Sequence, residues 1–142
     1  MKKKLFLLVL ALVVTMFLVG CGGSGILTTP ATDEAKVKSV VNEYYLALSN
    51  LNFSKAKSYC VYGSDRYYAV CQAEDLANTA YLYCNQVTVN AVVNIIDVSI
   101  SGSYSQVYSY VSYLITYCGY YEADEGYSYL NLQKIGNSWK LY

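Results

Sequence analysis

The chain has 142 residues, a formal net charge of 0 and no histidine. This length suits one domain with one core, and the missing histidine removes the commonest general base and metal ligand. No Lys or Arg occurs between Tyr67 and Gln133, so any site built from that span favours a neutral or cationic ligand.

Residues 1–20 have the three parts of a bacterial secretion signal. Lys2-Lys3-Lys4 is the basic start, Leu5 to Val19 is an apolar run, and Gly20 is the small residue before a cleavage site. The apolar run is shorter than the roughly 20 residues that a membrane-spanning helix needs. The remaining 122 residues carry 7 basic and 10 acidic side chains, and this negative balance argues against nucleic acid or anionic lipid as a ligand.

The sequence Leu18-Val19-Gly20-Cys21 resembles the lipobox of bacterial lipoproteins. In that family the cysteine is acylated, a signal peptidase cuts before it, and the cysteine becomes the lipidated N-terminus, with palmitate as a typical acyl chain. The resemblance implies an extracytoplasmic protein, anchored through lipid on Cys21 in a bacterial cell membrane or outer membrane. The alternatives are an uncleaved signal anchor and a secreted protein that carries Cys21 by chance.

Residues 21–31 contain several glycines and Pro30 and are typical of a flexible tether, so a single domain is expected at 32–142. Thr32 or Asp33 can cap a helix, and apolar residues recur at helical spacing over 33–50. Asn52 caps a short second helix at 53–59. Gly63, Ser64 and Asp65 indicate a loop at 61–70, and helical spacing returns at about 73–84.

From Gln86 the apolar residues alternate with polar ones, which is typical of β-strands. The adjacent Ile95 and Ile96 invert the alternation and indicate a β-bulge. The pattern predicts further strands at 104–118, 127–135 and 138–142. An acidic turn at 122–126 and a tight hairpin at Gly136-Asn137 would join them.

Helices followed by an antiparallel meander predict an α+β fold with helices packed on one face of a bent sheet. The segments VNEYYLALSN (41–50), FSKAKSY (53–59) and LQKIGNSWKLY (132–142) resemble the nuclear transport factor 2-like superfamily. Its cystatin-like, cone-shaped fold recurs in small bacterial lipoproteins. The resemblance covers residues 33–142 and implies a pocket at the mouth of the cone, between the sheet and the long first helix.

Four cysteines follow Cys21, namely Cys60, Cys71, Cys84 and Cys118. An even number in an exported chain predicts two disulfides, and three pairings are possible. The preferred pairing joins Cys60 to Cys71 across a short loop and Cys84 to Cys118 between a helix end and the sheet. The chain has no Cys-x-x-Cys pair and no histidine, so no metal and no cofactor are expected.

Tyrosine is unusually frequent, with 18 residues in the chain. A strand period of two places Tyr104, Tyr108 and Tyr110 on one face, and a hairpin brings Tyr127 and Tyr129 alongside. Rigid rings with polar tips suit the binding of a partner protein or of a neutral or cationic ligand. The alternative is cross-strand aromatic packing that stabilises a small sheet.

Asp97 is the charged residue of the first two long strands and lies at the predicted bulge. Enzymes of the resembled superfamily commonly use an Asp in the cone pocket, often together with Tyr or His. Asp97 is therefore either the base of such a site or a solvent-facing strand residue. Glu122, Asp124 and Glu125 indicate a solvated turn, because they lack the spacing of a calcium loop.

The sequence thus favours a membrane-tethered binding protein without enzymatic activity. A cyclase- or isomerase-like enzyme that uses Asp97 and a purely structural envelope protein are the alternatives.

Overall fold

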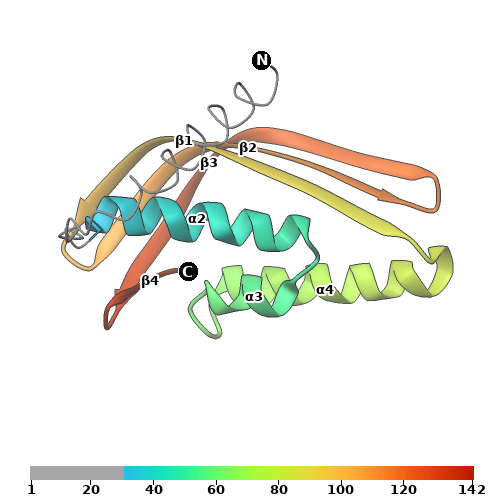
Figure 1. The fold of residues 1–142 in the computed structure, drawn as a ribbon, viewed down its shortest axis with the longest axis horizontal. Coiled ribbons are helices and arrows are strands. Elements are labelled where there is room, and N and C mark those ends of the chain that lie inside the picture. Colours follow the sequence, from blue (N-terminus) through green and yellow to red (C-terminus); the bar gives the residue numbers. More distant parts are fainter. Residues whose placement is uncertain (1–30) are drawn as a thin grey trace, which may run out of the picture. The chain divides into compact units, whose positions relative to one another are not determined.

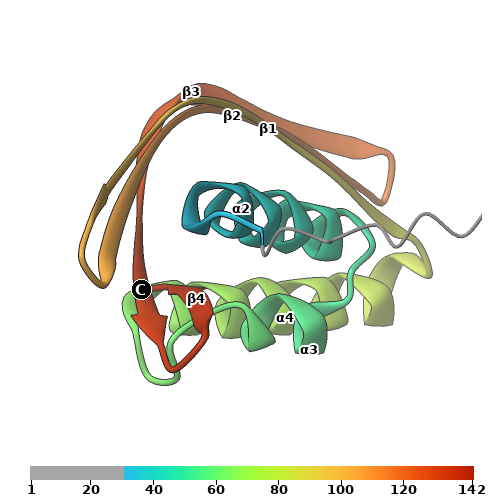
Figure 2. The same cartoon turned by 60° about the vertical axis from the view of Figure 1, so that its left-hand side comes forward.

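The computed structural model describes residues 31–142. Its helices are α2 (Asp33–Ser49), α3 (Phe53–Ser58) and α4 (Asp65–Cys84), and its strands are β1 (Val87–Ser101), β2 (Tyr104–Tyr117), β3 (Tyr120–Ile135) and β4 (Ser138–Leu141). The strands form one antiparallel sheet in the order β1-β2-β3-β4. The sheet curls over α2, and α3 and α4 lie beyond α2 from the sheet (Figures 1 and 2). The predicted α+β fold with helices on one face of a bent sheet is confirmed. The predicted signal peptide, the lipidation site Cys21 and the tether up to residue 30 lie outside the described residues and stay predictions.

The first two helices begin where the sequence predicts. The Thr32 hydroxyl accepts a hydrogen bond from the Ala35 backbone N–H at 3.2 Å, and the Asn52 side chain accepts one from the Lys55 N–H at 3.0 Å. Each cap satisfies a backbone donor that has no partner inside the first turn.

The third helix, α4, begins earlier than predicted. The Ser64 hydroxyl accepts from the Tyr67 N–H at 3.2 Å, so Ser64 is the N-cap and Asp65 lies in the first turn. The prediction of a loop through residue 70 and of a helix from about residue 73 is therefore wrong. Gly63, with a φ of +77°, completes the turn after α3 in a conformation that glycine adopts readily. The N-cap Ser64 follows it directly.

The bulge in β1 is confirmed. The β1–β2 register shifts between Ile95 and Asp97, so Ile96 is the extra residue and its side chain is 49% exposed. A bulge of this kind bends the strand, which helps the sheet to curve around α2.

The prediction of a turn at 122–126 is wrong. This acidic stretch is part of β3. The chain reverses instead at Cys118 and Gly119, which have φ values of +49° and +79°. Glu122 and Asp124 are held in the strand because the Tyr117 and Tyr113 hydroxyls donate to their carboxylates at 2.7 and 3.0 Å. Strand β3 therefore starts at Tyr120 rather than at Tyr127.

The core lies between α2 and the concave face of the sheet. Val37 and Val41 of α2 are fully buried, as are Val107 of β2 and Leu130 and Leu132 of β3. The end of α2 is joined to edge strand β1, because the Ser49 hydroxyl donates to the Ala91 carbonyl at 3.0 Å and accepts from the Ala91 N–H at 2.8 Å.

One of the two predicted disulfides is confirmed. Cys84 is bonded to Cys118 and ties the end of α4 to the β2–β3 hairpin. The predicted Cys60–Cys71 bond is wrong, since both cysteines are free thiols. The early start of α4 places Cys71 within a helix rather than at the end of a loop. Cys60 is 3% exposed, and burial raises the pKa of its thiol to about 11.

Candidate functional site

A cavity of about 670 Å³ lies between α4 and the concave face of β1 and β2. Its volume is within the range of small-molecule sites, about 300–1,000 Å³. The walls are mostly apolar. They include Tyr45 and Leu48 of α2, Ala73, Ala77 and Ala80 of α4, Val89 of β1, and Val111 and Ile115 of β2.

Small side chains make up much of the α4 wall of the cavity. Ala69, Ala73, Ala77 and Ala80 follow at helical spacing and all line the cavity, so they share one face of α4. Side chains of this size do not reach the opposite wall. The Cys84–Cys118 disulfide lines the cavity where α4 ends.

Arg66 and Glu122 are the charged side chains among the described residues that line the cavity. Arg66 belongs to the first turn of α4 and lies beside the buried Tyr44 and Tyr45. Burial raises the pKa of Tyr44 to about 12, against a lowering by the Arg66 charge. At the other end, the Glu122 carboxylate accepts from the Tyr117 hydroxyl, and this hydrogen bond raises the Tyr117 pKa.

The five tyrosines predicted to share a face do so, on the convex side of the sheet. We call this set the tyrosine strip; it consists of Tyr104, Tyr108, Tyr110, Tyr127 and Tyr129. The Tyr108 ring stacks between those of Tyr127 and Tyr129, with centroid distances of 5.6 and 4.9 Å, and Tyr110 meets Tyr127 edge-on at 5.1 Å. Tyr127 and Tyr129 remain 68% and 60% exposed. The strip is therefore both a cross-strand packing device and an exposed aromatic surface, and a binding role stays a prediction.

Asp97 lies on the same convex face, opposite Tyr108, and its side chain is exposed. Asp97 does not line the cavity, so it is not placed to act as a base on a ligand there. Among residues 31–142, no group of three or more Cys, Asp or Glu side chains is placed to hold a metal ion.

Sequence reasoning missed Arg66 as a cavity residue. The stretch 61–70 was expected to be a loop, and a side chain on a loop has no predictable direction. The signal was present, because Ser64 followed by Asp65 is a common helix start.

No known protein-family model matches the chain, and no curated protein matches it. Solved structures do match its fold. A putative dehydratase of the NTF2-like family from Streptomyces avermitilis has a TM-score of 0.59 at 14% identity, over 80% of this chain and 94% of that one. A ketosteroid isomerase-like protein from Erwinia carotovora atroseptica has a TM-score of 0.56 at 13% identity, over 78% and 92%.

A Mycobacterium tuberculosis protein of unknown function has a TM-score of 0.59 at 12% identity. The match covers 75% of this chain and 65% of that one. Identities this low show the fold alone. The domain therefore has the nuclear transport factor 2-like, cone-shaped α+β fold that the sequence resemblance implied.

Proposed function

We propose that this protein is a membrane-tethered bacterial lipoprotein whose domain binds a small, mainly apolar ligand in the cavity between α4 and the sheet. The cavity carries the proposal, since its volume and apolar walls match those of small-molecule sites. The lipobox-like Leu18–Cys21 supports the tether and an extracytoplasmic location.

No helix within residues 31–142 has both the length and the hydropathy to cross a membrane.

The enzymatic alternative has less support from the cavity. An isomerase or dehydratase needs a group that moves a proton at the substrate. Asp97 is on the opposite face of the sheet, and Glu122 already accepts a hydrogen bond from Tyr117. Binding alone requires apolar surface and a few polar groups that orient the ligand, and the cavity offers these.

The tyrosine strip supports a second candidate function, the docking of a neutral or cationic partner such as an envelope protein. Tyr127 and Tyr129 expose large parts of their rings on a sheet face that also carries two carboxylates. Glu125 lies two residues before Tyr127 on β3, and Asp97 of β1 is separated from Tyr129 by Tyr108. Strands β1 and β2 contain no Lys or Arg. The purely structural alternative has less support, because it requires neither a cavity nor an exposed aromatic surface.

The cavity is tested with a twelve-carbon alcohol that carries a photoreactive diazirine. The full chain is labelled in phosphatidylcholine nanodiscs, and the labelled peptides are mapped by mass spectrometry. We expect labels on α4, β1 and β2 residues that line the cavity. Ala80→Phe fills part of the cavity and should reduce this labelling at least tenfold without lowering the melting temperature by more than a few degrees.

The matched control is Ala123→Phe, which adds the same ring to an exposed position of β3 outside this cavity. It should label like the unchanged protein. Equal labelling of the Ala80→Phe and Ala123→Phe variants would contradict a ligand site in the cavity.

A further inference from the structure

Arg66, the single arginine of the chain, has no anionic partner within residues 31–142. Every lysine of that range has an acceptor. Five form ion pairs with carboxylates, and the sixth, Lys140, donates to the Ser58 carbonyl oxygen at 2.9 Å. Arg66 and Lys140 are thus the cations of this range without a carboxylate partner, and of the two only Arg66 lines the apolar cavity.

A half-buried guanidinium beside apolar walls gains from an anion, because burial weakens its hydration and its neighbour, the neutral Tyr44 hydroxyl, supplies no opposite charge. Its planar pair of N–H donors matches the two oxygens of a carboxylate. One guanidinium also balances the single charge of a carboxylate, whereas a phosphate dianion needs more donors. The Tyr44 phenol lies next to Arg66, and burial keeps it protonated, so it adds a neutral polar group at this end.

The remainder of the cavity fits an extended chain. Arg66 and Tyr83 both line it and are 17 residues apart on α4, which is about 25 Å along the helix axis. The cavity is therefore elongated along α4 and open to solvent on one side, where Leu76 and Tyr83 are mostly exposed. Between these ends α4 lines the cavity with four alanines, Leu76 and Thr79, and the facing strand residues include Val89, Val111 and Ile115.

The two charged ends set a direction for the ligand. Glu122 lies at the end of the cavity where α4 finishes, and its carboxylate repels a second anion there. An anionic head is therefore favoured at Arg66, and an uncharged tail at the Glu122 end.

We propose that the cavity binds an unbranched aliphatic carboxylate of the fatty-acid type, with its carboxylate at Arg66 and its chain along the alanine face of α4. This rests on the proposed function that the cavity is a ligand site. The proposal also revises the predicted charge of the ligand. A neutral or cationic ligand was predicted for a site built from the span Tyr67–Gln133, which contains no Lys or Arg, but Arg66 lies immediately before that span.

The test compares three diazirine-bearing twelve-carbon probes that differ only in their heads: the carboxylic acid, the alcohol and the trimethylammonium compound. The full chain is labelled in phosphatidylcholine nanodiscs at pH 8, where the acid is ionised, and half-saturating concentrations are measured by intact mass. We expect the acid to saturate the cavity at a concentration at least tenfold below that of the alcohol. Arg66→Gln should remove this preference by weakening acid labelling much more than alcohol labelling.

Arg66→Lys keeps the charge but loses the two-pronged geometry, so it should give an intermediate preference. Lys38→Gln, at an exposed lysine of α2, is the control and should behave like the unchanged protein. If Arg66→Gln fails to fold, two other results test the carboxylate proposal. These are the preference of the unchanged protein for the acid over the alcohol and the reduction of that preference in Arg66→Lys.

The outcomes separate the two proposals. Equal labelling by acid and alcohol, or stronger labelling by the ammonium probe, overturns the carboxylate proposal and leaves the cavity as a ligand site. No cavity labelling by any probe overturns both.

Discussion

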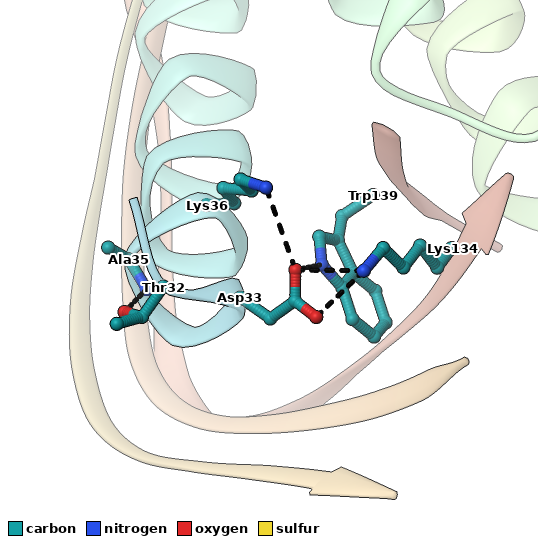
Figure 3. Close-up of polar contacts among 6 residues, drawn as sticks. All are labelled: Thr32, Asp33, Ala35, Lys36, Lys134 and Trp139. Atoms are coloured by element: carbon teal, nitrogen blue, oxygen red, sulfur yellow. Dashed lines mark hydrogen bonds and ion pairs between the residues drawn. The ribbon is translucent and has the colours of Figure 1, made fainter. Parts of the chain in front are cut away.

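Asp33 joins the first helix to the last hairpin of the domain. Lys134 donates to its two carboxylate oxygens at 3.0 and 2.8 Å, and the Trp139 indole N–H donates to one of them at 3.2 Å (Figure 3). The hydrogen bond from Lys134 lowers the Asp33 pKa most, and the one from Trp139 adds to it. Asp33 also lies in the first turn of α2, where the helix dipole favours a negative charge.

The Asp33 cluster predicts a pH-dependent contribution to stability. The folded pKa lies below the unfolded one, so the stabilisation is present above the unfolded pKa and is lost as pH falls through the folded pKa. Asp33→Asn should therefore lower the melting temperature at pH 7, and the difference from the unchanged protein should vanish well below pH 3.8. Thermal melts from pH 2 to pH 7 measure this. Glu34→Gln, which removes a more exposed carboxylate, is the control; a difference for Asp33→Asn that stays constant with pH would contradict the prediction.

At the scale of elements, helix starts, bulges and turns could be predicted where a short sequence pattern marks them. Thr32 and Asn52 are N-caps, the inverted alternation at Ile95–Ile96 marks the bulge, and Gly136-Asn137 turns the last hairpin. Each signal acts through neighbouring backbone groups, so it can be recognised without knowing the fold.

The start of α4 was not predicted although its local signal, Ser64 followed by Asp65, is present in the sequence. The start of β3 was not predicted because long-range contacts decide it. In β3, Asp124 stays extended because it pairs with Tyr113 of a long neighbouring strand and accepts from its hydroxyl. The missed start of α4 also explains why Arg66 was not predicted, since its place in the cavity depends on where α4 begins.

The tyrosine strip gives a prediction for the sheet face. Tyr108 lies between two rings, so Tyr108→Ser should mainly lower stability, by about 0.2–1 kcal/mol for each cross-strand pair lost. Tyr129 is 60% exposed, and Tyr129→Ser should instead weaken binding of a lysine-rich peptide by about two- to fivefold, because an exposed cation–π contact contributes about 0.5–1 kcal/mol. Biolayer interferometry measures the binding, with a glutamate-rich peptide as the charge control.

The matched variant is Tyr62→Ser, which removes a tyrosine that is 85% exposed and lies outside the strip. It should leave peptide binding unchanged. If Tyr129→Ser lowers the melting temperature as much as Tyr108→Ser and binding does not change, the strip is a packing device alone.

At the scale of the whole molecule, the sheet separates two candidate surfaces. The cavity lies on the concave face of β1 and β2 and the tyrosine strip on the opposite face, so a ligand in one leaves the other accessible. The proposed ligand site and the proposed partner surface can therefore be occupied at the same time.

The anchor itself is tested at Cys21, within the lipobox-like sequence. Each buried CH₂ of an acyl chain contributes roughly 0.8 kcal/mol, so several chains on one cysteine hold a protein firmly at a membrane. Cys21→Ala should release the protein from the membrane fraction or leave an uncut precursor of higher mass. Cys71→Ser, which removes a partly exposed free thiol in α4, is the control and should remain in the membrane fraction. Fractionation followed by intact-mass measurement distinguishes the two results, and a Cys21→Ala protein that fractionates and migrates like the unchanged protein would show that Cys21 is not the anchor.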